Sequence, residues 1–105
     1  MFSWDPAKAE RNLRKHGISF DEATRAFSDP NAFDGPDFKH SQVEPRRLLI
    51  GVLPDGRIIT VAYTKRIGTD GETTRIISAR QANARDRLER EYQRATDPRR
   101  RDRLL

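Results

Sequence analysis

The sequence has 105 residues, which is enough for one domain with a modest hydrophobic core and too few for several domains. Hydrophobic residues make up 34% and charged residues 35%, but the apolar residues recur with regular periods, which argues against general disorder. The chain contains no cysteine, which excludes disulfides and thiolate metal sites, and it has no apolar run typical of a signal peptide or a membrane span. We therefore expect a cytoplasmic protein with no membrane association.

The net charge of +5 is unevenly distributed. Residues 99–105 contain four arginines and one aspartate, so this tail contributes +3 and the other residues only +2. Overall basicity is therefore weak evidence for nucleic-acid binding, and the positions of the charges must carry the argument. We expect a single α+β domain over residues 1–98, followed by a solvated basic tail over residues 99–105.

The N-terminal segment predicts a short strand and then a helix. Phe2 and Trp4 alternate with a polar residue, which predicts a strand with both aromatic side chains facing inward. Asp5 is a typical N-cap and is followed by a proline suited to the first helical position. The helix is predicted to end near His16, because Gly17 can adopt the left-handed conformation that terminates helices.

Ala9 and Leu13 fall on the predicted inner face of this helix. A second helix is predicted to begin at once, because Ser19 and Glu22 match the capping-box pattern. It is predicted to end at Asp29, which precedes a proline and so avoids the helical region. Its core-facing residues are predicted to be Phe20, Ala23 and Phe27.

Residues 31–44 predict an edge strand or a loop, because Gly35-Pro36 interrupts the pattern. Three strands with alternating apolar residues are then predicted, at Arg47–Leu53, Arg57–Lys65 and Thr73–Ala79. Short turns join them, which predicts an antiparallel meander. The residues that share a face are predicted to be Leu48, Ile50 and Val52 in the first strand, and Ile59, Val61 and Tyr63 in the second. In the third strand, Ile76 and Ile77 would contribute one side chain to each face.

Residues 78–81 again fit a capping box and predict the start of a last helix, which Pro98 would end. Asp86 and Arg90 are spaced for an ion pair along this helix. Its apolar stripe is predicted to contain Ala84, Leu88, Tyr92 and Ala95. The sequence therefore predicts an α+β fold: an antiparallel β-meander sheet with two N-terminal helices and one C-terminal helix. The helices would cover one face of the sheet and leave the other open.

Five short motifs follow one another along the chain. They are Phe2-x-Trp4-Asp5-x-x-Lys8, Asn12-x-x-Lys15-His16-Gly17-Ile18-Ser19-Phe20-x-Glu22-Ala23, Tyr63-Thr64-x-Arg66, Arg75-Ile76-Ile77-Ser78-Ala79-Arg80 and Glu91-Tyr92. Together they make the sequence similar to the BrnT family of toxins over residues 2–92. The loop at residues 68–72 is longer than usual in that family, and the arginine tail looks like an addition to it.

The resemblance implies a fold similar to that of the RelE-type ribonucleases. It implies an activity, the cleavage of RNA with arrest of translation. It also implies a partner, a BrnA-like antitoxin with a ribbon-helix-helix DNA-binding domain, and contact with operator DNA only through that antitoxin. These expectations come from the family and not from composition or periodicity.

Arg80 and Arg66 are the candidate phosphate-binding residues. Arg80 would lie near the start of the last helix, where backbone N–H groups and a guanidinium can hold the same phosphate oxygens. The alternative for Arg80 is an ion pair with Glu44 or Asp86. Arg66 closes a strand beside a loop, where functional side chains are common, and its alternative is a solvated charge. The resemblance favours phosphate for both, so we expect their guanidinium groups to meet at one exposed pocket.

His16 and Lys65 are the candidate proton-transfer residues. His16 lies where the helix dipole favours a protonated imidazole, although a residue that simply aids the helix end is an equally ordinary interpretation. Lys15, Tyr63 and Arg75 are candidate RNA contacts. A lysine in the last turn of a helix is common, however, and a strand tyrosine more often belongs to the core than to a base-stacking surface.

The chain has only one other histidine, His40, in a weakly patterned region, so we expect no metal site and no cofactor. If the chain cleaves RNA, as the resemblance implies, the simplest route is metal-free, and the 2′-hydroxyl attacks the adjacent phosphate. Arg66 and Arg80 would stabilise the developing charge, and His16 or Lys65 would move protons. A non-catalytic RNA- or protein-binding module explains the charge equally well, but it does not explain cations at the start of a helix.

Overall fold

The computed structural model describes residues 1–40 and 44–97. The predicted basic tail at residues 99–105 lies outside these described residues. In chain order the elements are β1 (Phe2–Ser3), α1 (Pro6–His16), α2 (Phe20–Ala23), the 3₁₀ helix η1 (Thr24–Ser28), β2 (Phe33–Pro36), β3 (Arg47–Val52), β4 (Ile58–Gly68), β5 (Gly71–Gln81) and α3 (Ala84–Thr96). Within the described part, no helix is both long enough and apolar enough to span a bilayer.

The strands form one five-stranded sheet in the order β1-β5-β4-β3-β2. The pairs from β2 to β5 are antiparallel, as predicted for a meander, and Phe33–Pro36 is the predicted edge strand. The prediction of a purely antiparallel sheet is wrong, because β1 pairs in parallel with β5 and places Phe2 beside Thr74. No hairpin connects these two strands, so the direction of β1 is set by the path of the chain into α1. The α+β class is confirmed, with a mixed sheet.

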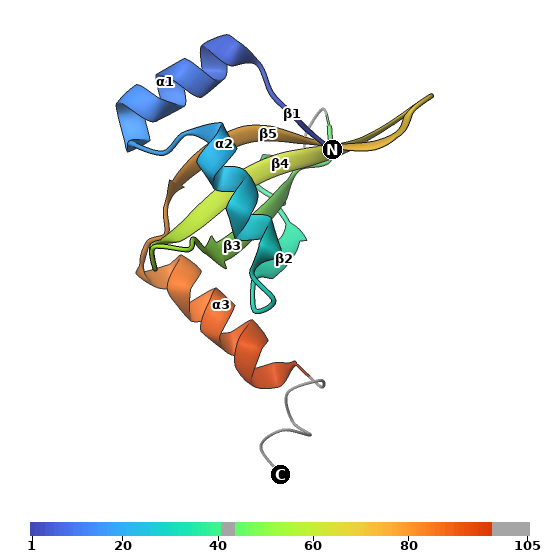
Figure 1. Cartoon of the computed structure of the whole chain (residues 1–105). Coiled ribbons are helices and arrows are strands. Elements are labelled where there is room, and N and C mark those ends of the chain that lie inside the picture. The colour runs from blue at the N-terminus through green and yellow to red at the C-terminus, as the bar shows by residue number, and fades with distance from the viewer. Residues whose placement is uncertain (41–43, 98–105) are drawn as a thin grey trace.

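The N-terminal helices cover one face of this sheet (Figure 1). We call it the core face, because α1, α2 and η1 bury the main hydrophobic cluster against it. The buried residues of that cluster are Ile18, Phe20, Ala23, Ala26, Leu49, Leu53, Ile59, Val61, Tyr63, Ile76 and Ala79. The opposite face, which we call the second face, is covered less completely, since α3 extends from one end of the sheet (Figure 1).

The predicted apolar face of β3, which contains Leu48 and Ile50, does not face the core. The register places Leu49 opposite Val61, so Leu49 lies on the core face and its neighbours Leu48 and Ile50 lie on the second face. Gly51 also faces the core, where a Cβ would lie 2.6 Å from the carbonyl oxygen of Ala26. This glycine therefore allows η1 to approach the sheet closely.

A β-bulge interrupts the pairing of β4 with β5. Ala62 pairs with Ser78, but the next residue, Tyr63, pairs with Ile76, so Ile77 is an extra residue in β5. The bulge turns Ile76 into the core, where it is buried. It also turns Arg75 to the second face, the same face as Ser78.

Helix α3 begins later than predicted. Residues 78–81 belong to β5, because the pairing with β4 continues until Gln81 lies opposite Ile59. The N-cap of α3 is Asn83, whose side chain accepts from the N–H of Asp86, while the Asp86 carboxylate accepts from the N–H of Asn83. This is a complete capping box. Arg80 is therefore a strand residue and not a helix-start residue.

The predicted apolar stripe of α3 faces solvent, because the helix packs through its polar side. Leu88 and Tyr92 are each 70% exposed, whereas Asp86 and Arg90 are buried. The predicted ion pair between these two residues does not form. Asp86 binds Arg80, and Arg90 donates from Nε and Nη2 to the buried carboxylate of Asp29 at 3.0 and 2.9 Å.

The Asp29 carboxylate joins η1, β3 and α3. Burial alone would raise its pKa, but hydrogen bonds from the N–H groups of Asn31 and Val52 and from Arg90 together hold the pKa of Asp29 below its ordinary value. The stability from this site is present above the pKa of the unfolded carboxyl, and it is lost as the pH falls through the lowered folded value.

Helix α1 has both predicted ends and α2 has the predicted start, but α2 ends at Ala23, and the 3₁₀ helix η1 continues to Ser28, directly before the predicted end at Asp29. Asp5 caps α1 by accepting from the N–H of Ala7, Gly17 ends it with φ of 71°, and Ser19 caps α2 by accepting from Glu22. The predicted inner position of Leu13 is wrong, because this side chain is 49% exposed.

Asn12, next to Leu13 in α1, is buried instead and bonds to the edge of the sheet. Its Nδ2 donates to the carbonyl of Ala79 at 2.8 Å and to that of Ile18 at 3.0 Å. Its Oδ1 accepts from the N–H of Ala79 at 3.1 Å. The amide thus pairs with β5 as a neighbouring strand would.

We predict that Asn12→Ala lowers the free energy of unfolding by about 1–3 kcal/mol, because it leaves buried backbone groups of Ala79 and Ile18 without partners. Urea denaturation measures this change. Arg11→Ala, at the exposed neighbouring position, is the control and should change stability by less than about 0.5 kcal/mol. Equal stability of the two variants would contradict the structural role of Asn12.

Candidate nucleic-acid interface

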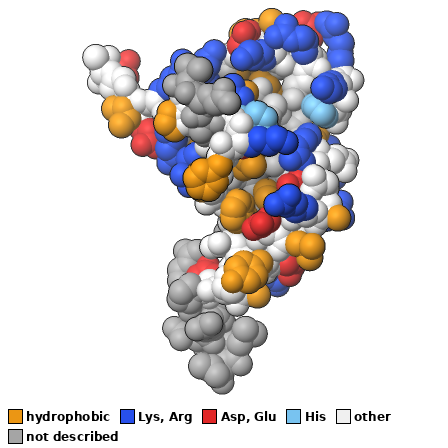
Figure 2. Space-filling view, turned by 180° about the vertical axis from the view of Figure 1, so that it is seen from behind, with side chains coloured by type: hydrophobic (Ala, Val, Ile, Leu, Met, Phe, Trp, Pro, Cys, Tyr) orange, Lys and Arg blue, Asp and Glu red, His pale blue; other side chains and the backbone are white. Residues whose placement is uncertain are grey.

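Three arginines of β4 and β5 lie on the second face of the sheet. The register places Arg66 opposite Thr73, Arg75 opposite Thr64 and Arg80 opposite Thr60. Arg66 and Arg75 are therefore diagonal neighbours, a relation that brings residues within about 7–8 Å. Figure 2 shows this face, where Lys and Arg side chains border a central group of hydrophobic side chains, with histidine among them.

We expected Arg66 and Arg80 to meet at one phosphate pocket, but the structure places them apart. Arg66 lies six positions along β4 from Thr60, the partner of Arg80, which is about 20 Å along a strand. Each guanidinium also binds its own carboxylate. The three arginines instead form a row. An extended single strand of nucleic acid lying along this row would contact each arginine through a different phosphate.

Arg80 keeps part of its hydrogen-bonding capacity. Its Nη1 donates to Asp86 at 2.5 Å and to the carbonyl of Gln81 at 3.3 Å. Among the described residues, its Nε and Nη2 have no partner, and these two donors form the fork that binds a phosphate bidentately. Burial would raise the pKa of Asp86, but Arg80, the N–H of Asn83 and Thr60 hold it below the ordinary value. Asp86 thus stays ionised and holds Arg80 in place.

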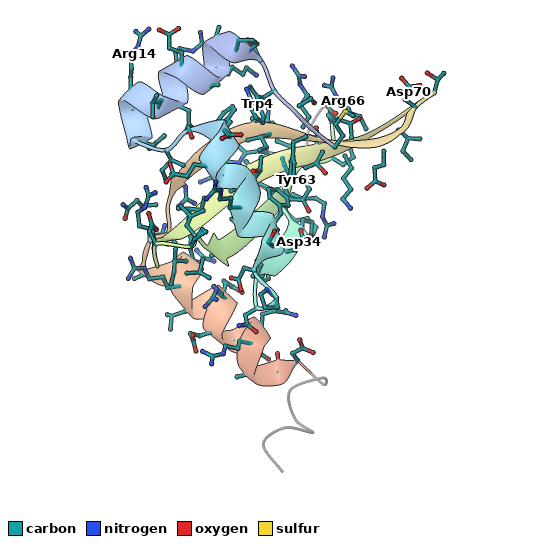
Figure 3. The ribbon with its side chains drawn as sticks, viewed as in Figure 1. Trp4, Arg14, Asp34, Tyr63, Arg66 and Asp70 are labelled. Carbon is teal, nitrogen blue, oxygen red and sulfur yellow. The ribbon has the colours of Figure 1, made fainter. Side chains whose placement is uncertain are left out.

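Arg66 lies farther along β4, toward the turn that carries Asp70 (Figure 3). Its Nε and Nη2 donate to the two oxygens of Glu44 at 3.1 and 3.2 Å. Hydrogen bonding to Arg66 lowers the pKa of the exposed Glu44 carboxyl. A phosphate would therefore have to replace Glu44 at this fork. Arg75, by contrast, is half-buried and has no hydrogen-bond or ion-pair partner within the described ranges.

A cavity of about 680 Å³ lies on the second face beside the first turn of α3. Its volume is in the range of small-molecule sites. The apolar part of the wall comes from the β2–β4 side, and the charged part includes Arg80 and side chains outside the sheet. The apolar lining residues include Phe33, Phe38, Leu48, Ile50 and Ala62, the cationic ones are Lys39, Arg46, Arg80 and Arg85, the acidic ones are Asp37, Asp86 and Glu89, and His40 also lines the cavity. Apolar surface beside arginine groups suits a flat apolar group that carries a phosphate.

The other predicted site residues do not line this cavity. Lys65 pairs with Glu72 at 3.2 Å and lies on the opposite face of β4 from Arg66, because neighbouring residues in a strand alternate. It lines a neighbouring cavity of about 340 Å³, which shares Pro36, Phe38 and Arg46 with the first. His16 and Lys15 are in the last turn of α1, where His16 is half-buried and Lys15 is exposed. The structure thus brings neither predicted proton-transfer residue to Arg80. Within the described ranges, no group of three or more His, Asp or Glu is placed to hold a metal ion.

Tyr63 is a core residue, 1% exposed, and its ring offers no face to a base. Its hydroxyl donates to Asp34 at 2.7 Å and accepts from Nε of Arg47 at 3.2 Å. Tyr63 points from β4 toward Asp34 of β2 (Figure 3). Burial, and then the hydrogen bond to Asp34, raise its pKa to about 12, against the lowering effect of Arg47.

His40, Arg46 and Arg85 line the cavity but were not predicted as site residues from the sequence. The only local signal for His40 was its position three residues after Asp37, a spacing that allows an ion pair. Arg46 lies directly before a predicted strand, and Arg85 in a predicted helix, where solvated arginines are ordinary. Only the pairing of distant segments shows that they line one cavity.

Comparison with known proteins decides the family. A family model described as "Ribonuclease toxin, BrnT, of type II toxin-antitoxin system" matches residues 4–86. The chain belongs to the BrnT family. The matched segment of this BrnT-family chain contains all three arginines of the row and ends in the first turn of α3. Membership of a type II family implies an antitoxin partner.

A solved structure supports the assignment. The fold is similar to the 1.1 Å crystal structure of the Brucella abortus ribonuclease toxin BrnT, with 27% sequence identity and a TM-score of 0.59. The similarity covers 79% of this BrnT-family chain and 97% of the Brucella chain. The search of curated proteins found no match.

We predict that Tyr63→Phe lowers the free energy of unfolding by about 0.5–1.5 kcal/mol, because it removes the hydroxyl between Asp34 and Arg47. RNA affinity, measured by gel shift, should stay the same because the ring is buried. Lost affinity in a variant that keeps its thermal stability would instead place Tyr63 in the interface.

Proposed function

We propose that this chain is a toxin that cleaves RNA endonucleolytically, through attack by the RNA's own 2′-hydroxyl, and thereby arrests translation. The observation that carries this proposal is the row of Arg66, Arg75 and Arg80 on the second face, next to a cavity with apolar and cationic walls. The arginine row and the cavity together suit single-stranded RNA, because guanidinium groups bind phosphates and apolar surfaces bind bases.

The cleavage step needs charge stabilisation and proton transfer. The 2′-oxygen forms a bond to the adjacent phosphorus, its proton passes to a base, and the bond to the 5′-oxygen breaks with protonation of that oxygen. Arg80 would bind the phosphate through Nε and Nη2 and stabilise the charge that develops on its oxygens. Arg66 and Arg75 would hold neighbouring phosphates. The cations of the site supply this stabilisation in the proposed route, which uses no metal ion.

His16 and Lys65 remain proposals for the proton transfer, although neither lines the cavity that contains Arg80. Lys15 is likewise proposed as an outer RNA contact. A RelE-like fold relationship is consistent with α helices packed on one face of a meander, and it would place this toxin among the small ribonucleases that act in the cytoplasm.

We further propose that the antitoxin is a BrnA-like protein with a ribbon-helix-helix domain. The toxin would then contact operator DNA only through that antitoxin. The alternative function is a non-catalytic module that binds RNA or protein. A gel assay separates the two, because a binding module shifts labelled RNA and a nuclease shortens it.

We predict that Arg80→Ala reduces RNA cleavage by about 10²–10³-fold, because it removes the phosphate-binding fork. The rate of shortening of a labelled RNA measures the effect, and growth arrest in cells should be lost in parallel. Arg25→Ala is the matched control, because it removes the same charge from an exposed position in η1. Equal cleavage by wild type and Arg80→Ala, at equal thermal stability, would contradict the proposed role.

We also predict that EDTA leaves the cleavage rate unchanged, since the proposed charge stabilisers are arginines. The rate is measured after dialysis against EDTA and again after addition of Mg²⁺. Loss of activity on chelation, with recovery on addition of the metal, would refute the metal-free route.

A further inference from the structure

His40 lines the same cavity as Arg80, although these residues are 40 positions apart in the chain. It is the only histidine in the lining of that cavity, since His16 belongs to α1 and does not line it. Histidine is the side chain best suited to take up and release a proton near neutral pH. One cavity therefore contains both a proton-transfer group and a phosphate-binding group.

A buried carboxylate holds the imidazole of His40. Nδ1 of His40 lies 3.0 Å from Oδ2 of Asp37, and the side chains are 56% and 8% exposed respectively. The contact with Asp37 favours the tautomer that carries its proton on Nδ1, which leaves Nε2 as the acceptor. The more exposed ring can thus present Nε2 to a ligand.

The backbone around Asp37 is itself fixed. Its N–H donates to the carbonyl of Arg46 at 2.8 Å, and its carbonyl accepts from the N–H of His40 at 3.3 Å. These bonds tie the segment that carries His40 to the start of β3. Arg46 also lines the cavity, so its wall is joined by backbone hydrogen bonds and not only by side-chain contacts.

We propose that His40, positioned by Asp37, is the general base for RNA cleavage in this cavity. This rests on the proposed ribonuclease function and assigns its missing proton acceptor. Nε2 of His40 takes the proton of the 2′-hydroxyl as the 2′-oxygen bonds to phosphorus, and the electron pair of the breaking bond goes to the 5′-oxygen, which takes a proton from water. The products are a 2′,3′-cyclic phosphate and a free 5′-hydroxyl, and the imidazolium then returns its proton to solvent.

Other charged groups line the cavity together with the imidazole. They are Asp37 in the same segment, Arg46 just before β3, Arg80 in β5, and Asp86 and Glu89 in α3. Lys39 and Arg85 complete the charged lining of the cavity. A base acts only when unprotonated, so the cleavage rate should fall as acid protonates the imidazole.

The test compares His40→Gln with His16→Gln in the full-length protein, with a 5′-labelled RNA as substrate. His40→Gln should lower the cleavage rate at least 100-fold, as expected for loss of a general base (~10²–10⁴). RNA affinity by gel shift should remain close to that of the wild type. The fall in rate at acid pH should disappear from the residual activity. His16→Gln should lower the rate less than His40→Gln does, and Arg25→Ala, at an exposed position in η1, should cleave as the wild type does.

Two further measurements keep the test decisive. Added imidazole should partly restore cleavage by His40→Ala, which a purely structural role would not allow. Asp37→Asn should lower the rate less than His40→Gln does and should shift the pH profile, because Asp37 is a positioning residue. Circular dichroism checks that each variant is folded.

The outcomes separate the two proposals. Wild-type activity that persists in His40→Gln with an unchanged pH profile would overturn the role of His40 and leave the ribonuclease function intact. A wild-type protein that shifts RNA without shortening it would overturn both. Loss of activity in His16→Gln together with full activity in His40→Gln would move the base to α1.

Discussion

The hydrogen bonds between the Asn12 side chain and the backbone of Ala79 hold the N-terminal helices against the sheet. Strand β1 covers the outer edge of β5 only at Thr74 and Arg75, and the Asn12 amide satisfies the edge farther along. An unpaired edge is a site for association with other strands, so this amide also protects β5. The same amide binds the carbonyl of Ile18, which fixes the turn from α1 into α2.

The position of the candidate site depends on that contact. Ala79 directly precedes Arg80, so the residue that anchors α1 from the core side is next to the residue that faces the cavity. A second anchor, the buried pair of Asp29 and Arg90, ties α3 to η1 and to β3. Helix α3 supplies Asp86, which holds Arg80. The guanidinium of Arg80 is thus positioned by two polar networks that reach it from different helices.

Local rules predicted much of the fold from the sequence. The caps at Asp5 and Ser19 and the end at Gly17 follow from chemistry within a few residues, and the structure confirms them. The start of α3 did not follow, because residues 78–81 match a capping pattern while the pairing with β4 keeps them in a strand. A long-range register decided between two locally acceptable conformations.

The candidate site was predictable only in part, for the same reason. The three arginines could be named from the sequence, and Asp86 was one of the two carboxylates considered for Arg80, but the pairing of Arg66 with Glu44 was not predicted, because it depends on tertiary packing. The outward stripe of α3 was mispredicted, because an amphipathic pattern does not show which side of a helix is buried when a charged pair such as Asp29–Arg90 does the anchoring. His40 had no pattern of its own, and only the cavity gives it a role.

The bulge at Ile77 makes the length of β5 as important as its composition. Arg75 and Arg80 are five positions apart, an odd separation that strict alternation would assign to opposite sides of the ribbon. The extra residue changes this parity, so both cations emerge together while Ile76 turns inward. Deleting Ile77 would remove the bulge and restore strict alternation, with Ile76 still in the core and both arginines still on the second face. Adding a further residue between Ile76 and Ser78, without a wider bulge, would instead turn Ile76 to the second face. The number of residues in this strand, and not only their type, therefore decides which side chains share a face with Arg80.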